Sequence, residues 1–352
     1  MAVKLSLCMI VKNEEAVLKR CLSSVPFVDE IVVADTGSTD GTKEIAKEFT
    51  DAVYDYAWTD DFAAARNFSF SKATGDYLMW LDADDVIEGE NLKLFAELKK
   101  LLARRRPDVA MCRYNVSFDE DGAPAFTYYR ERIVKRGANM RWEGFVHECI
   151  PPRGDVLYSE AAVSHRKIAA GNPRRNLELY QKAIFRAPLS CAREKYYYGR
   201  ELYYNRLYRE AVCILEDALT DPALWRVDAA EACGVIAQCH IALLAYDKAL
   251  AAAFKSFSFS VPRAETLCLI GKIFQLKKDF SAAVYWYEQA LAAPPSALGF
   301  NRPEYADFVP AIELCVCHYN LGDYEKAAAY HKKAKDLRPH HPSVVANERY
   351  FS

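Results

Sequence analysis

The sequence lacks paired cysteine motifs. Its 11 cysteines are odd in number and scattered along 352 residues without a Cys-x-x-Cys pair, and Cys315 and Cys317 lie closest together. This pattern argues against both a disulfide framework and a structural zinc site. Cys8, Cys213 and Cys268 lie in apolar runs, where a free cysteine acts as a small hydrophobic residue. We therefore expect a protein of a reducing compartment, the cytoplasm.

Basic blocks and long hydrophobic runs are also missing. The formal net charge is -2, and no Lys/Arg run is longer than Arg104–Arg106, so the sequence shows no electrostatic footprint for nucleic acid. The first apolar run, Leu5–Val11, is too short for a signal-peptide core or a membrane helix. We expect neither a nucleic-acid partner nor a transmembrane segment.

The first half of the chain alternates between strand and helix patterns. The composition, 51% hydrophobic and 27% charged, is that of a soluble globular protein, and the length suggests two domains. Alternation of this kind predicts an α/β domain with a mostly parallel sheet. The predicted strands are Leu5–Val11, Glu30–Asp35, Ala52–Ala57, Tyr77–Leu81, Asp108–Phe118, Tyr128–Val134 and Val156–His165, with helices at Glu14–Val25 and Asp61–Ala73 and a turn at 119–124.

Three carboxylates follow the apolar run Tyr77–Leu81, at Asp82, Asp84 and Asp85. Ligands of open α/β sheets bind outside the carboxyl ends of the strands, so these acids face the expected crevice. Hard oxygen ligands suit Mg²⁺ or Mn²⁺, which carboxylates and substrate phosphates commonly share. The pattern therefore predicts a site for a metal ion and a nucleotide diphosphate, the alternative being a solvated acidic turn.

Two further features belong to the same end of the sheet. Asp35 ends its strand and is followed by a Gly-bearing turn with Gly37 and Gly41, a pattern that favours either anion binding at the start of a helix or a simple capped turn. Arg66, a strong cation on the small-residue helix, could bind a diphosphate or a carboxylate through its planar fork, or form an ordinary ion pair.

These segments, taken in order, resemble inverting glycosyltransferases of family 2, which have the GT-A fold. The resemblance rests on MIVKNEE, VVADTGSTDGT, AAARN, GDYLMWLDADD, MRWEGFVHE and a late histidine, and it covers roughly the first half of the chain. It is closest to bacterial members fused to helical repeats, including those that glycosylate bacteriocin peptides and flagellins.

The resemblance implies a role for individual residues. It implies a metal site at Asp82, Asp84 and His165, with Mn²⁺ or Mg²⁺ as the cofactor. It also implies that a UDP-sugar donor contacts the following positions: Ile10, Val11, Glu14, Asp35, Gly37, Arg66, Asp82, Ala83 and Trp142. Trp142 could stack on a sugar or fill the core.

An inverting transfer needs a carboxylate that removes the acceptor proton. Glu148 is our choice for this base, with Glu143 behind it. His147 could share the role, because the sequence reads His147-Glu148 where many members of the family have two acids.

The second half carries helical patterns with an interval near 34 residues. Small and large residues recur in register, as Gly199, Ala211, Leu215 and Ala218 and again as Gly271, Ala283, Tyr287 and Ala290. This pattern resembles tetratricopeptide repeats. We place the domain boundary near 169–173, giving a catalytic domain at 1–170 and an all-α repeat domain at 171–352. An insertion is expected at 294–308.

The repeats suggest a peptide or protein acceptor, presented by the repeat surface and modified at Ser, Thr or Cys, or a homodimer through the repeats. Two alternatives remain open, namely transfer to a cell-envelope saccharide and a non-catalytic repeat scaffold.

Overall fold

The computed structural model describes residues 2–118, 122–168, 172–294 and 302–351. The chain divides into two compact units, Met1–Pro173 and Arg174–Ser352. Three of the segments discussed above, 119–121 in the predicted turn, 169–171 at the predicted boundary and 295–301 in the predicted insertion, lie outside the described residues.

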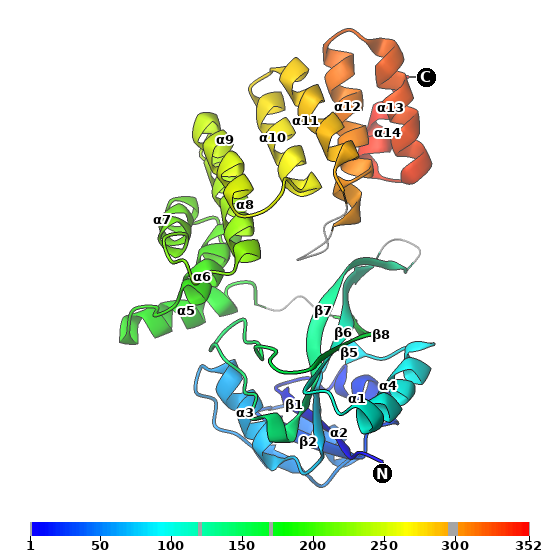
Figure 1. The fold of residues 1–352 in the computed structure, drawn as a ribbon, viewed down its shortest axis with the longest axis vertical. Coiled ribbons are helices and arrows are strands. Elements are labelled where there is room, and N and C mark those ends of the chain that lie inside the picture. The colour runs from blue at the N-terminus through cyan, green and yellow to red at the C-terminus, as the bar shows by residue number, and fades with distance from the viewer. Residues whose placement is uncertain (1, 119–121, 169–171, 295–301, 352) are drawn as a thin grey trace. The chain divides into compact units, whose positions relative to one another are not determined.

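The first unit is an α/β domain built on one mixed sheet (Figure 1). The strand order is β3-β2-β1-β4-β7-β6-β8-β5, in which β1, β2, β3 and β4 run parallel, β7 is antiparallel to β4 and β6, and β8 is parallel to β6. The strands are β1 (Leu5–Val11), β2 (Glu30–Asp35), β3 (Val53–Asp55), β4 (Tyr77–Trp80), β5 (Asp85–Val86), β6 (Val109–Phe118), β7 (Pro124–Lys135) and β8 (Val156–His165). The predicted fold class is confirmed.

Helices cover both faces of this sheet. Odd-numbered β1 residues such as Leu7 and Met9 pack with α1, α2 and α4, whereas Cys8 packs with α3 on the other face. This alternation is the period of two expected of a strand that is buried on both sides. The helices are α1 (Leu18–Ser23), α2 (Thr42–Lys47), α3 (Phe62–Lys72) and α4 (Asn91–Arg105), with a 3₁₀ turn at Arg136–Ala138.

Several element bounds differ from the predicted ones. The helix predicted at Glu14–Val25 is shorter, because the N–H groups of Val17 and Leu18 both bond to the Glu14 carbonyl in a turn that precedes α1. Strand β7 begins at Pro124 rather than Tyr128, because its first residues pair with β6. The two-residue strand β5 was not predicted.

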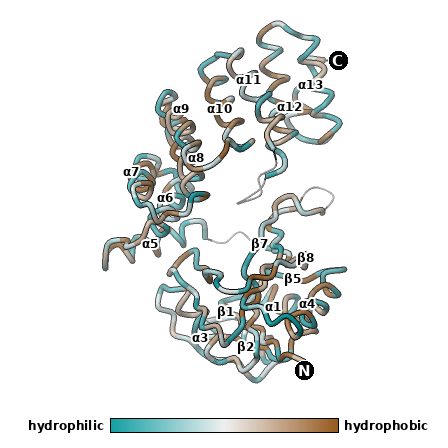
Figure 2. Tube along the Cα trace, in the orientation of Figure 1, coloured by the Kyte–Doolittle hydropathy of each residue, from teal (hydrophilic) through white to brown (hydrophobic). Residues whose placement is uncertain are grey.

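The second unit is all-helical. Its helices are α5 (Arg175–Arg186), α6 (Ala192–Tyr204), α7 (Tyr208–Ala218), α8 (Arg226–Ala242), α9 (Tyr246–Lys255), α10 (Ala264–Leu276), α11 (Phe280–Ala292), α12 (Phe308–Asn320), α13 (Tyr324–Leu337) and α14 (Pro342–Glu348), with 3₁₀ turns at Ser256–Ser258 and Pro303–Tyr305. Figure 2 shows hydrophobic and hydrophilic residues mixed along these helices, as pairwise packing requires.

The recurring small residues allow the paired helices to approach closely. A Cβ added at Gly199 of α6 would lie 2.5 Å from Cγ of Leu215 in α7, and one added at Gly271 of α10 would lie 3.0 Å from the Tyr287 ring in α11. The same small-to-large contact is therefore made in both repeats, as the sequence pattern predicts.

Candidate active site

The loop that follows β4 carries the acidic cluster. It closes on itself through two hydrogen bonds, from Asp85 N to the Asp82 carbonyl at 3.0 Å and from Asp82 N to Asp85 Oδ2 at 3.1 Å. From outside the loop, Arg166 N donates to the Asp84 carbonyl at 2.8 Å. The backbone of the loop that carries the three acids is therefore held beyond the end of the strand by two main-chain hydrogen bonds and one to the Asp85 carboxylate.

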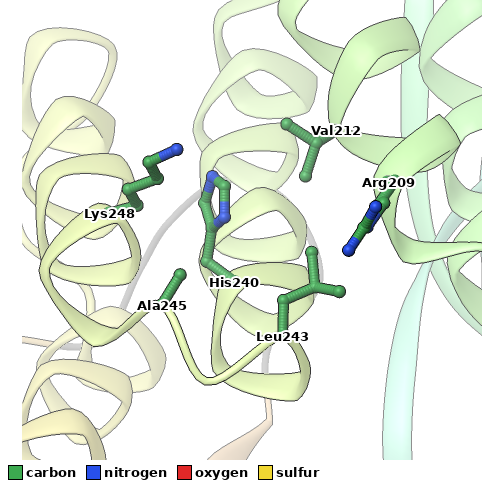
Figure 3. A pocket seen from close by; sticks show the side chains of 6 residues that line it. All are labelled: Arg209, Val212, His240, Leu243, Ala245 and Lys248. Atoms are coloured by element: carbon green, nitrogen blue, oxygen red, sulfur yellow. The ribbon is translucent and has the colours of Figure 1, made fainter.

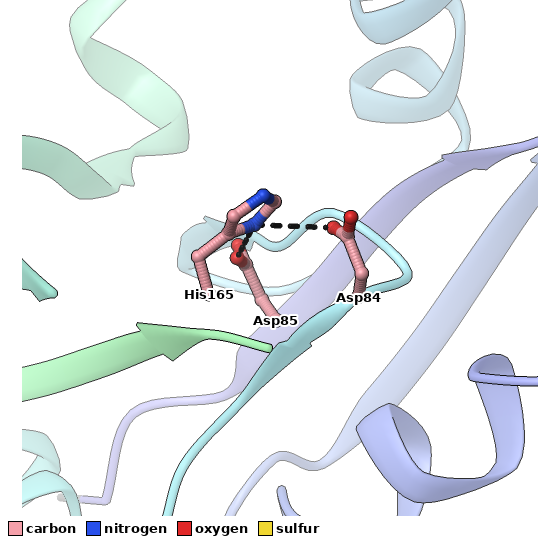
Figure 4. A group of neighbouring side chains, drawn as sticks. All are labelled: Asp84, Asp85 and His165. Carbon is pink, nitrogen blue, oxygen red and sulfur yellow. Dashed lines mark hydrogen bonds and ion pairs between the residues drawn. The ribbon is translucent and has the colours of Figure 1, made fainter. Parts of the chain in front are cut away.

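His165 joins this loop from the end of β8. Asp85 lies opposite His165 in the β5–β8 register. Figure 4 shows the imidazole facing both Asp84 and Asp85, with His165 Nδ1 at 3.3 Å from Asp84 Oδ1 and 3.2 Å from Asp85 Oδ1. Two hydrogen bonds raise the pKa of His165 to about 10. The bond with Asp84 contributes most and the bond with Asp85 next.

This cluster has the donor set of a divalent-cation site. Asp84, Asp85 and His165 each offer a ligand atom, and these atoms lie within 4.8 Å of one another. Carboxylate oxygens with one imidazole nitrogen suit Mn²⁺ and accommodate Mg²⁺. The structure thus brings the predicted residues Asp84 and His165 together, and it adds Asp85 to them.

Asp82 has a different neighbour, Arg66. The Arg66 guanidinium donates from Nη2 to Asp82 Oδ1 at 2.6 Å and from Nε to Glu148 Oε1 at 2.7 Å. Burial alone would raise the pKa of Asp82, but the charges of Arg66 and Arg132 lower it to about 2. Arg66 therefore joins the acidic loop to the segment that carries the predicted base.

Two indole rings hold this arginine in place. The Arg66 guanidinium carbon lies 5.0 Å from the Trp80 ring centroid and 4.7 Å from that of Trp142, distances that allow cation–π attraction. Trp142 is 3% exposed and packs against Trp80 and Phe70. The structure therefore places Trp142 in the core, the second of the two roles considered for it.

The predicted base and its alternatives lie in one irregular segment. Glu143 and Cys149 exchange backbone hydrogen bonds, and between them Gly144 and His147 adopt positive φ angles of 90° and 53°. The Glu148 side chain is 12% exposed beside Arg66, whereas that of Glu143 is 60% exposed with Arg153 at 3.9 Å. The closed segment thus directs Glu148 inward to the arginine and leaves Glu143 at the surface.

The predicted base-recognition residues gather at the ends of β1 and β2. Asp35 is buried, and its Oδ1 accepts hydrogen bonds from the N–H groups of Gly37 and Ser38, both at 2.9 Å. Its Oδ2 has no hydrogen-bond partner among the described residues. Val11 is paired with Asp35 in the β1–β2 register, and the Glu14 N–H donates to Thr42. Asp35 thus has an unsatisfied acceptor where a nucleobase donor is expected.

The turn after Asp35 has little capacity left for an anion. Thr39 N donates to Asn13 Oδ1, Gly41 N to Glu15 Oε2 and Thr42 N to Asp40 Oδ1. Because side chains already accept these hydrogen bonds, the structure favours a simple turn at the start of α2 over anion binding there. Of the remaining predicted residues, Val11 and Ala83 are buried and Ile10 is half-buried.

Sequence reasoning missed Arg132 and Tyr114. Arg132 is fully buried and donates from Nη1 to Asp85 Oδ2 at 3.0 Å, and the Tyr114 hydroxyl donates to Asp85 Oδ1 at 2.9 Å. The sequence offers one indication that Arg132 is unusual, which is that this charged residue directly precedes Ile133 and Val134 at the apolar end of β7.

The second unit has a hollow of its own. It measures about 350 Å³ and lies against α7, α8 and α9, where Figure 3 shows His240 between Arg209 and Lys248. Its remaining walls are Val212, Leu243 and Ala245.

Comparisons with known proteins divide the chain in the same way. The family described as Glycosyl transferase family 2 matches residues 6–153, and the tetratricopeptide repeat matches residues 264–296 and 316–341. Among the described residues, no helix is both long and apolar enough to cross a membrane.

Two curated relatives and one solved structure are similar to parts of the chain. A TPR repeat-containing protein of Synechococcus elongatus is 38% identical over 149 residues, covering 42% of this chain and 35% of that protein. The prophage-derived glycosyltransferase SunS of Bacillus subtilis is 28% identical over 225 residues, covering 60% of this chain and 52% of SunS. The chain therefore spans about half or less of these relatives. The TPR protein YrrB matches with a TM-score of 0.39 at 17% identity, covering 50% of this chain and 84% of YrrB.

Proposed function

From a family 2 glycosyltransferase domain followed by tetratricopeptide repeats, we propose that this enzyme transfers a sugar from a UDP-sugar to a side chain of a peptide or protein. The observation that carries the proposal is the convergence of Asp84, Asp85 and His165 beyond the strand ends, where an α/β sheet binds its ligands. The similarity to SunS, a glycosyltransferase, supports the same reaction class.

Donor binding is assigned to the ends of β1, β2 and β4. The unsatisfied Oδ2 of Asp35 accepts a hydrogen bond from the nucleobase, and the backbone beside Ile10 and Val11 lines the same place. Asp84 and His165 hold a divalent cation, which when bound supplies positive charge to neutralise the departing diphosphate. Asp82, already paired with Arg66, joins the site through its loop.

Proton removal from the acceptor is assigned to Glu148. Its carboxylate is held by Arg66, so it keeps one orientation instead of sampling rotamers. Glu143 is the alternative base, because its side chain is 60% exposed to solvent, from which an acceptor approaches. His147 lies close to both acids in the chain.

The repeats are proposed to bind the acceptor. Helical repeats of this type form extended binding surfaces, and a polypeptide acceptor explains why the enzyme carries them. A second copy of the chain is the other proposed occupant.

The proposal is tested with the full chain and a panel of UDP-sugars. We expect one or more of them to raise the unfolding temperature with Mn²⁺ present, and to lose that effect in EDTA. Transfer is then read by mass spectrometry on a library of Ser-, Thr- and Cys-containing peptides. Equal stabilisation by UDP with and without EDTA would remove the metal from the proposal, and binding without any peptide mass shift would favour a saccharide acceptor.

A further inference from the structure

Asp85 differs from the other two members of the cation cluster in exposure. The side chains of Asp84 and His165 are each 23% exposed, whereas that of Asp85 is completely buried. A cation arriving from solvent therefore reaches Asp84 and His165 directly, but it reaches Asp85 only if the packing around that carboxylate opens.

Both oxygens of Asp85 are already engaged by the protein. Oδ1 accepts a hydrogen bond from the Tyr114 hydroxyl at 2.9 Å and lies 3.2 Å from His165 Nδ1. Oδ2 accepts from Arg132 Nη1 at 3.0 Å and from the Asp82 backbone N–H at 3.1 Å. These contacts use the lone pairs that a metal ligand would need to offer.

Arg132 is an unusual partner because its side chain is also completely buried. Its guanidinium carbon lies 3.8 Å from the Trp80 ring centroid and 4.2 Å from that of Tyr114, so the group is enclosed between two aromatic rings. A buried charge is retained only when it is paired, and Asp85 supplies the pairing carboxylate. The guanidinium is thus held by the Asp85 carboxylate and two aromatic rings, while its Nε and Nη2 atoms have no hydrogen-bond partner among the described residues.

We propose that Asp85 is a positioning residue and not a cation ligand. Together with Arg132 and Tyr114 it forms a buried anchor that pins the Asp82–Asp85 loop beside the end of β8, so that Asp84 and His165 face the cation. The proposal rests on the metal-dependent function proposed above. Under this proposal, Tyr114 of β6 and Arg132 of β7 help to build the metal site.

The test asks whether Asp85 acts as an anchor or as a cation ligand. It replaces Asp85 by the neutral Asn, with and without removal of the Arg132 charge. Asp85→Asn alone leaves Arg132 buried without its carboxylate, whereas Asp85→Asn combined with Arg132→Met removes both charges and keeps an oxygen facing Tyr114. Mn²⁺ affinity is measured on the full chain by electron paramagnetic resonance, with and without UDP, and pulsed spectra report the imidazole nitrogen on the bound Mn²⁺. Asp84→Asn is the matched ligand control, and circular dichroism checks that each variant is folded.

If Asp85 is an anchor, the second substitution should restore the Mn²⁺ affinity that the first one loses. Outer-shell partners of metal ligands typically contribute about 10- to 100-fold to metal affinity, so Asp85→Asn should lose affinity in that range and the double variant should recover most of it with its imidazole signal intact. Tyr114→Phe, which keeps both charges, should weaken Mn²⁺ binding by about 10-fold on the same grounds.

Two results would overturn the anchor while leaving the proposed function in place. One is a double variant that binds Mn²⁺ as poorly as Asp84→Asn, which would make Asp85 a ligand. The other is a Tyr114→Phe variant with unchanged affinity and spectra. Wild-type protein that binds no Mn²⁺ in either condition would instead remove the metal from the proposed function, and the anchor inference with it.

Discussion

Replacing Arg66 by methionine removes the charge that joins the acidic loop to the base segment, while roughly keeping the volume between the two indoles. The Arg66 side chain is 9% exposed and bonds to Asp82, which is 36% exposed, and to Glu148, which is 12% exposed. Breaking a buried ion pair by removing one partner costs about 3–5 kcal/mol. Because water screens Asp82, we expect the low end, about 3 kcal/mol.

The assay is urea unfolding of the full chain followed by tryptophan fluorescence, which Trp80 and Trp142 beside the mutated position make sensitive to this unit. In a unit of this size, 3 kcal/mol corresponds to a loss of about 6–12 °C in unfolding temperature. The matched control is Lys19→Met, which breaks an exposed pair with Glu48 and should cost less than about 1 kcal/mol. An Arg66→Met variant no less stable than this control would refute the reasoning.

The stability lost in the Arg66→Met variant should also depend on pH. Arg66 helps to lower the pKa of Asp82 to about 2, below its ordinary value of 3.8. A lowered folded-state pKa contributes stability that is present above about pH 4 and is lost as the pH falls through about 2. The stability difference between wild type and Arg66→Met should therefore shrink over that acid window, and a difference that is constant with pH would contradict the role assigned to the Arg66–Asp82 pair.

Three further predictions concern the proposed base, the metal site and the repeats. Glu148→Gln should lower the transfer rate by about 10²- to 10⁴-fold with nucleotide affinity nearly unchanged, whereas Glu143→Gln stays active; the reverse result on one acceptor would move the base to Glu143. Asp84→Ala should abolish transfer without loss of cooperative unfolding, because this side chain is partly exposed at the tip of a loop. Burial raises the pKa of Asp228 to about 6, so the stability that this acid contributes is present below about pH 4 and is lost as the pH rises through 6. Asp228→Asn should accordingly be more stable than wild type by up to about 3 kcal/mol at pH 8 and equal to it near pH 4, and an equal difference at both pH values would contradict this account.

Much of the first unit could be predicted because its strands are continuous apolar runs with polar ends. The bounds of β1, β2 and β8 agree with the predicted ones. The sequence singles out Asp35, Asp84 and His165 as candidates because they stand at or just beyond strand ends. The close packing of paired repeat helices could also be predicted from the recurrent glycines Gly199 and Gly271, since each lies against a large residue of the next helix.

The rest depends on pairings between residues that are far apart in the sequence. Arg66 meets Glu148 across 82 residues and Arg132 meets Asp85 across 47. No periodicity encodes which arginine reaches which acid, so the sequence does not show that Arg66 pairs with Asp82. Strand β5 was missed for the same reason, because two residues form a strand only where β8 supplies a partner.

The place of His165 at the end of β8 also governs when the site can exist during synthesis. Asp85 and its loop leave the ribosome 80 residues before His165. The loop therefore has no histidine partner while α4, β6 and β7 are made. Strand β8 must then pair with β6 and β5, a non-local closure that is slow compared with helix formation. A nascent chain that stops short of this strand lacks the imidazole, so the proposed cation site is complete only once the whole domain has been made.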